Sequence, residues 1–235
     1  MSPMAGGTTG KRLAGKTVIV TGAGSRAPGI GNGRAIAVLF ARHGANVLLV
    51  DQNVEAAQET LAMIESEKGS ALVHAPADVT KEEDCKLIVS AAVKAWGRLD
   101  VLVNNVGIGA RVRATVVDLP TDEWLRVMMT NIYSMMLMTK NAVPELRKAG
   151  GGAIVNIGSF GGRYPSANNN AYATSKGAIL PFTRSLAVDH GKDGIRANCI
   201  LPGMVATPMG LTNKAGAAET DEQRTARQQA ERERR

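Results

Sequence analysis

The residues in this chain of 235 with the clearest potential for chemistry are Tyr172 and Lys176, which stand four positions apart. That spacing places both side chains on one face of a helix. A phenol alone is a poor base at neutral pH, because its ordinary pKa is about 10. A neighbouring ammonium favours the phenolate, so the pair is suited to exchanging a proton with an alcohol or a ketone. The motif taken alone also fits an exposed helix pair without function.

Short apolar runs alternate with helical patterns along the chain, as they do where strands are connected by helices. This alternation predicts a single α/β domain, with a doubly wound, parallel, Rossmann-type sheet of six strands covered by helices on both faces. We expect a flexible segment at 1–12, the folded domain at 13–209 and a polar, charged segment at 210–235. The expected strands are 17–21, 46–51, 71–76, 99–104, 153–157 and 195–201, and the expected helices are 34–42, 54–68, 81–96, 121–148 (with Thr121 as a candidate N-cap) and 171–190.

Composition argues against several classes of partner. The formal charge is +7, but the basic residues are scattered and, near the end, interleaved with acidic ones. Such a mixed run is typical of a solvated helix face, so we expect no nucleic-acid partner.

No apolar run reaches the ~20 residues of a membrane span and no signal peptide is evident, which favours a cytoplasmic protein without a membrane partner. Cys85 and Cys199 lack metal-ligand spacing, and we expect reduced, buried thiols and no metal.

A glycine-rich loop over 21–33 joins the first expected strand to the first expected helix. Glycines allow a tight turn there and let a pyrophosphate approach backbone N–H groups, while the helix N-terminus adds partial positive charge. A glycine loop without a ligand is the alternative. The candidate phosphate-binding residues are Gly22, Ser25, Gly29, Gly31 and Gly33.

Other candidate cofactor residues follow the next expected strands. Asp51 stands eighteen residues after Gly33, where a carboxylate can accept hydrogen bonds from ribose hydroxyls and repel a 2′-phosphate. This favours NAD. NADP is also possible, because Arg26 in the glycine loop could reach a phosphate. The alternative for Asp51 is that it serves only as a turn cap. Asp78 and Val79 are candidates to bracket the adenine. Asn105 and Gly107 stand where a cofactor would pass.

These motifs together resemble the short-chain dehydrogenase/reductase family over about 13–209. The glycine loop looks like its Thr-Gly-x-x-x-Gly-x-Gly, and 104–107 is similar to its Asn-Asn-Ala-Gly. Ser159, thirteen residues before Tyr172, matches the family serine. The resemblance implies that Asn131 is the helix-borne asparagine, which holds a water linking Lys176 to solvent. It also implies nicotinamide contacts from Pro202, Gly203, Val205 and Thr207.

The resemblance implies an oxidoreductase that transfers a hydride between a nicotinamide cofactor and a secondary alcohol or ketone. Tyr172 would be the general acid and base, and Ser159 would hold the substrate oxygen. Lys176 would also bind the nicotinamide ribose, so both members of the pair are cofactor-binding as well as catalytic. Family members form homodimers or homotetramers through the long methionine-rich helix and the tyrosine-bearing helix, and we expect the same here.

Two features depart from the family pattern. The glycine loop is longer by about five residues, 26–30. The segment 210–235 contains no apolar run fit to be the usual seventh strand, so the chain looks truncated and would leave a sheet edge exposed. A catalytically impaired nucleotide-binding or interaction protein is therefore the alternative function.

Overall fold

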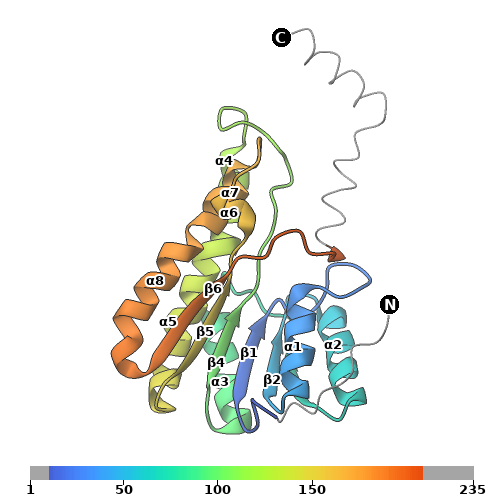
Figure 1. Cartoon of the computed structure of the whole chain (residues 1–235). Helices are drawn as coiled ribbons and strands as arrows, with labels where there is room; N and C mark the ends of the chain where they lie inside the picture. The colour runs from blue at the N-terminus through green and yellow to red at the C-terminus, as the bar shows by residue number, and fades with distance from the viewer. Residues whose placement is uncertain (1–10, 209–235) are drawn as a thin grey trace.

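The computed structural model describes residues 11–208, which fold around one sheet of six parallel strands in the order β3-β2-β1-β4-β5-β6 (Figure 1). The chain starts at β1 in the centre, proceeds outward to β3, returns to β4 and proceeds outward again to β6. This arrangement confirms the predicted doubly wound fold, and its switch point lies between β1 and β4. The strands are β1 (Thr17–Thr21), β2 (Asn46–Val50), β3 (Ser70–His74), β4 (Val101–Asn104), β5 (Gly152–Ile157) and β6 (Ile195–Ile200).

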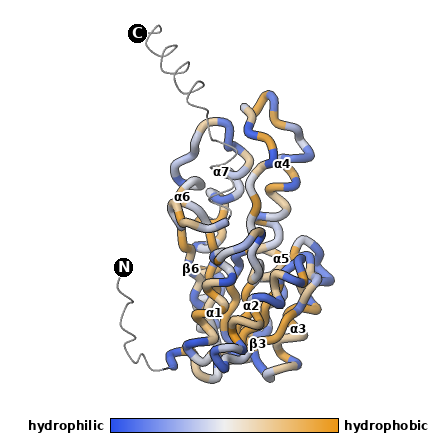
Figure 2. Tube along the Cα trace, turned by 90° about the vertical axis from the view of Figure 1, so that its right-hand side faces the viewer, coloured by the Kyte–Doolittle hydropathy of each residue, from blue (hydrophilic) through white to orange (hydrophobic). Residues whose placement is uncertain are grey.

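Apolar residues of the central strands point alternately to two separate cores. In β1, Val18 and Val20 belong to one buried cluster and Ile19 belongs to the other. Because both faces are covered, β1 is a continuous buried run rather than an alternating one. Helices α1 (Asn32–Arg42) and α2 (Val54–Ser66) cover the first face, and α3 (Glu82–Trp96), α5 (Ser134–Lys148) and α8 (Ile179–His190) cover the second (Figures 1 and 2).

The long helix expected over 121–148 is three helical segments. They are α4 (Thr121–Met128), a π-helical turn η1 (Met129–Tyr133) and α5. A single π-turn does not disturb the apolar periodicity enough to show in a sequence. Thr121 is not the N-cap: that position is Pro120, whose carbonyl accepts from the Trp124 N–H, so Thr121 already lies in the first turn.

The helix expected over 171–190 is divided into α7 (Asn170–Gly177) and α8. Pro181 lies in the first turn of α8 and has no N–H to donate to the carbonyl of Gly177, which explains the break. A short helix α6 (Phe160–Arg163) and a 3₁₀ turn η2 (Gly191–Asp193) were not predicted.

Strand β6 forms one edge of the sheet among residues 11–208. It pairs with β5, and its Arg196, Asn198 and Ile200 are exposed. Cys85 is buried as expected, whereas Cys199 on this edge strand is only partly buried. The predictions for the segments 1–12 and 210–235, including the missing seventh strand, lie almost entirely outside the described residues.

Within 11–208 no helix is long and apolar enough to cross a membrane. The same residues hold no group of three or more His, Cys, Asp or Glu side chains placed to bind a metal ion.

Candidate active site

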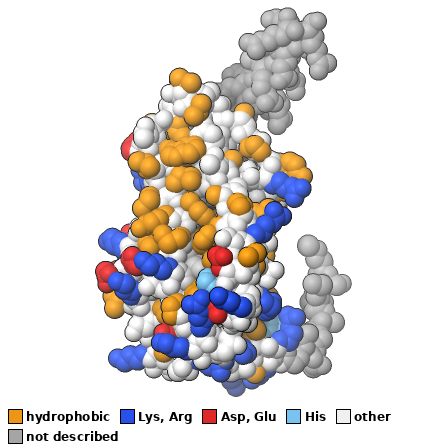
Figure 3. Space-filling view, turned by 90° about the vertical axis from the view of Figure 1, so that its left-hand side faces the viewer, with side chains coloured by type: hydrophobic (Ala, Val, Ile, Leu, Met, Phe, Trp, Pro, Cys, Tyr) orange, Lys and Arg blue, Asp and Glu red, His pale blue; other side chains and the backbone are white. Residues whose placement is uncertain are grey.

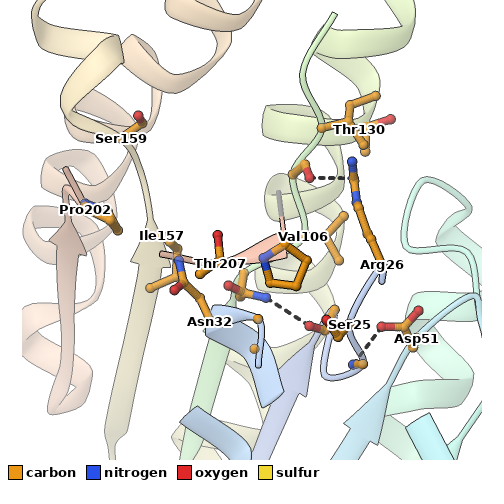
Figure 4. A pocket seen from close by; sticks show the side chains of 18 of the residues that line it. Ser25, Arg26, Asn32, Asp51, Val106, Thr130, Ile157, Ser159, Pro202 and Thr207 are labelled. Carbon is orange, nitrogen blue, oxygen red and sulfur yellow. Dashed lines mark hydrogen bonds between the residues drawn. The ribbon is translucent and has the colours of Figure 1, made fainter. Parts of the chain in front are cut away.

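A cavity of about 990 Å³ lies at the carboxyl ends of the strands, across the switch point between β1 and β4 (Figure 4). This is where open α/β sheets bind their ligands. Of the residues singled out in the sequence, Gly29 and Asn131 do not line it. Those that do are Gly22, Ser25, Gly31, Gly33, Asp51, Asp78, Val79, Asn105, Gly107, Ser159, Tyr172, Lys176, Pro202, Gly203, Val205 and Thr207.

The glycine loop packs tightly against the loop after β4. A Cβ atom on Gly33 would overlap the carbonyl oxygen of Gly22 and the side-chain amide of Asn105, so the start of α1 can approach the sheet only with glycine at that position. The side-chain amide of Asn105 donates to the carbonyls of Thr21 and Gly22, both at 3.0 Å. Gly31 occupies the N-cap of α1 without a side-chain cap, which suits the helix N-terminus to an anion.

Asp51 follows β2 directly and fixes the other side of the glycine loop. Its Oδ2 accepts from the Gly24 N–H at 2.9 Å and its Oδ1 accepts from the Asn53 N–H at 3.0 Å (Figure 4). A Cβ on Gly24 would lie 2.7 Å from that of Ala56, so this approach also requires glycine. Asp51 therefore caps the turn and also lines the cavity.

Asp78 lies at the same end of the cavity, after β3. Its Oδ1 accepts from the N–H and the hydroxyl of Thr80, at 3.0 and 2.7 Å. Burial raises the pKa of Asp78, but these bonds and the charge of Lys81 outweigh it and hold the pKa below its ordinary value. The carboxylate is thus ionised at neutral pH.

Ser159 and Tyr172 are brought together by the unpredicted helix α6. Ser159 is its N-cap, and its hydroxyl accepts from the Gly161 N–H at 3.1 Å. A Cβ on Gly161 would lie 3.4 Å from the Ser159 hydroxyl and 3.6 Å from the Tyr172 ring, so this glycine lies between the two side chains. A Cβ on Gly162 would lie 2.6 Å from the backbone of Gly177, and α6 therefore packs directly on α7.

Lys176 is the most enclosed charged group of the cavity, with 5% of its surface exposed. Its ammonium donates to the Ile157 carbonyl at 2.9 Å. The pKa of Lys176 is lowered to about 8, chiefly by burial; Cys199 opposes this shift and the charge of Arg26 adds to it. With that pKa, about nine in ten of these ammonium groups stay charged at pH 7.

Asn131 lies behind the cavity wall, fully buried in the π-turn η1. Its Oδ1 accepts from the Ile108 N–H at 2.7 Å, and its Nδ2 donates to the Ile108 carbonyl and the Ser175 hydroxyl, both at 2.9 Å. Among residues 11–208 its side chain makes no hydrogen bond to its own helix and instead joins the loop after β4 to α7.

Several lining residues had no role assigned from the sequence, among them Arg113, Arg126 and Thr130. Arg126 pairs with Glu123 at 2.7 Å, and this hydrogen bond, against the effect of burial, lowers the pKa of Glu123 to about 2. The spacing of Glu123 and Arg126, three residues apart on a helix, is the sequence pattern from which this ion pair could have been predicted. Arg113 donates to the Ser166 hydroxyl at 3.1 Å, which no local pattern foreshadows.

A doubly wound sheet with a glycine loop at its switch point defines a dinucleotide-binding fold. The family model of the short chain dehydrogenases matches residues 16–218. The chain therefore belongs to the short-chain dehydrogenase family and is an NAD(P)-dependent oxidoreductase of that family.

Named relatives agree with this assignment. The chain is 37% identical over 195 residues to 2-(R)-hydroxypropyl-CoM dehydrogenase of Xanthobacter autotrophicus, covering 83% of this chain and 76% of the relative. It is 39% identical over 207 residues to 7α-hydroxysteroid dehydrogenase of Clostridium sardiniense, covering 86% of this chain and 76% of the relative. A solved structure of a 7α-hydroxysteroid dehydrogenase complexed with NADH and 7-oxo glycochenodeoxycholic acid superposes with a TM-score of 0.79 at 34% identity, covering 86% of this chain and 76% of that one.

Proposed function

We propose that this chain transfers a hydride between NAD and a secondary alcohol or ketone, with Tyr172 as the general acid and base. The observation that carries the proposal is that Ser159, Tyr172 and Lys176 line the same cavity as the glycine loop and Asp51. The alternative of a catalytically impaired nucleotide-binding protein is not favoured, because the named relatives are dehydrogenases.

The residues at one end of the cavity fit a nicotinamide dinucleotide. Gly22, Gly31 and the first turn of α1 provide bare backbone where phosphates bind, and Asp51 provides a carboxylate where a ribose would lie. Asp51 disfavours the 2′-phosphate of NADP, which supports NAD over NADP. When bound, the nicotinamide supplies or accepts the hydride.

At the other end the side chains are suited to handling a proton. The Tyr172 hydroxyl gives a proton to a ketone oxygen or takes one from an alcohol. The Lys176 ammonium, one helical turn away, favours the phenolate by its charge. The Ser159 hydroxyl donates to the substrate oxygen and stabilises charge that develops there. Asn131, through Ile108 and Ser175, holds the wall against which these groups are placed.

Assembly is part of the proposal. Figure 3 shows hydrophobic side chains gathered on the face seen from the side of α8. The described residues include exposed apolar side chains on α8 and α4, namely Val188 (81% exposed) and Leu125 (54% exposed). Exposed apolar side chains gathered on one face mark a protein interface. We propose a homodimer or homotetramer built through these helices.

The test combines binding with turnover. NADH binding is followed by fluorescence, and reduction or oxidation is assayed on a panel of secondary alcohols and ketones. We expect NADH to bind and at least one substrate of this class to turn over. Binding without turnover on a broad panel would support the impaired alternative and contradict the proposal. Light scattering of the same sample reports the oligomeric state, and a monomer would refute the interface.

A further inference from the structure

The insertion in the glycine loop begins with Arg26, whose side chain crosses the cavity. Its guanidinium donates to the carbonyl oxygen of Gly107 at 2.8 Å, so it connects the loop after β1 with the loop after β4. Figure 4 shows this side chain reaching from the glycine loop to the backbone beside Val106 and toward Thr130. Because Arg26 lies in the insertion, the family motif assigns it no role.

The insertion is held in place by side chains. Arg34 on α1, which is only 5% exposed, donates to the Gly29 carbonyl at 3.0 Å and to the Ala56 carbonyl at 3.1 Å. It also pairs with Glu59 on α2 at 2.6 Å. At the other end of the insertion, the Ser25 hydroxyl donates to the Ala27 carbonyl at 2.8 Å. The loop is therefore fixed to α1 and α2, and it places Arg26 over the cavity.

The charge of Arg26 is not neutralised by a carboxylate hydrogen bond within residues 11–208. Within these residues its guanidinium bonds to a neutral carbonyl, whereas the neighbouring Arg126 is paired with Glu123. Arg26 is exposed to solvent, and its partial desolvation and then the charge of Arg126 lower its pKa, against an opposite effect of Asp51. Arg26 in turn contributes to the lowered pKa of Lys176. An anion beside Arg26 would relieve this crowding of positive charge.

We propose that Arg26 is a cofactor-binding residue, whose guanidinium binds the diphosphate of the dinucleotide as it enters between the glycine loop and Gly107. A guanidinium presents paired N–H donors that match phosphate oxygens, and such charge-assisted bonds are stronger than the bond to the Gly107 carbonyl that it makes now. This inference rests on the dinucleotide site proposed above. It assigns a binding role to the insertion, which lengthens the loop at the mouth of the cavity.

The experiment compares Arg26→Gln, Arg26→Lys and the wild-type protein. Arg12→Gln is the matched control, because Arg12 is an exposed arginine just before β1, at the end of the sheet opposite the cavity. Binding is measured for NADH by fluorescence, for ADP-ribose by competition with NADH, and for adenosine by ligand-observed NMR. ADP-ribose keeps the diphosphate but lacks nicotinamide, and adenosine lacks both.

We expect Arg26→Gln to weaken the binding of NADH and of ADP-ribose by about tenfold and to leave the affinity for adenosine unchanged. Arg26→Lys recovers part of the loss, and Arg12→Gln binds all three like the wild type. Equal affinities for NADH in Arg26→Gln and wild type would overturn the inference alone. A parallel loss for adenosine would also overturn it, because the residue would then order the loop rather than bind the diphosphate. A wild-type protein that does not bind NADH would instead overturn the proposed function.

Discussion

The ammonium of Lys176 fits against Gly107 because that residue has no side chain: a Cβ atom there would lie 2.7 Å from the ammonium nitrogen and 3.2 Å from Cε. Gly107 follows β4, and Lys176 lies in α7, 69 positions further along the chain. The contact links the loop that borders the dinucleotide to the helix that carries Tyr172. The family glycine at this position therefore has a second purpose besides leaving room for a ligand.

Gly107→Ala is expected to displace Lys176 and to lower kcat/KM by 10- to 100-fold, because small misplacements of a catalytic group are costly. The matched control is Gly109→Ala in the same loop, where a new Cβ meets nothing within 4 Å. Steady-state kinetics of the two variants check the prediction. Equal activity of Gly107→Ala and wild type would show that the position of the ammonium does not matter.

Asp51→Asn is expected to reduce the preference for NAD over NADP by about tenfold, because the fixed negative charge that repels a 2′-phosphate is removed. The amide keeps one oxygen that can accept from the Gly24 or the Asn53 N–H, so the loop stays close to its native form. The ratio of the two Kd values is the measurement. An unchanged ratio would remove Asp51 from the ribose site and leave it as a turn cap.

Lys176→Met tests the buried charge through the pH dependence of stability. The pKa of Lys176 is about 8 in the folded protein, lowered from an unfolded value near 10.5. The unfolded chain therefore binds more protons between these pH values, and wild-type stability gains about 3 kcal/mol from this group as pH rises across that interval. The free energy of unfolding of wild type and Lys176→Met is measured with denaturant at pH 7 and pH 10.5. Relative to the variant, the wild type should be more stable at pH 10.5 than at pH 7 by that amount. A constant difference would mean that Lys176 is not desolvated.

Much of the fold was readable because parallel strands buried on both faces give short apolar runs, of which β1 is the clearest. The π-turn around Asn131 was not readable, since five residues of altered hydrogen bonding leave the apolar period intact. Helix α6 was hidden by Gly161 and Gly162, because glycine is a poor helix former; the packing on α7 requires glycine at position 162.

The candidate site shows the same division. Tyr172, Lys176, Ser159 and Asp51 stood out because their residue types and spacings carry chemistry, and the structure brings them to one cavity. The contact of Arg26 with Gly107 joins residues 81 positions apart, so only the folded chain reveals it. The bonds of Asn131 to Ile108 and Ser175 could not be predicted, because these partners depend on how the loop after β4 folds back.

The most direct measurement of the central claim is turnover by Tyr172→Phe alongside its affinity for NADH. Removing the hydroxyl should lower kcat by 10²- to 10⁴-fold, as expected for loss of a general acid and base, while the Kd for NADH stays within about twofold of wild type. Tyr164→Phe is the control, because Tyr164 is an exposed tyrosine after α6 that does not line the cavity. A Tyr172→Phe variant that binds NADH and turns over substrate at the wild-type rate would contradict the account.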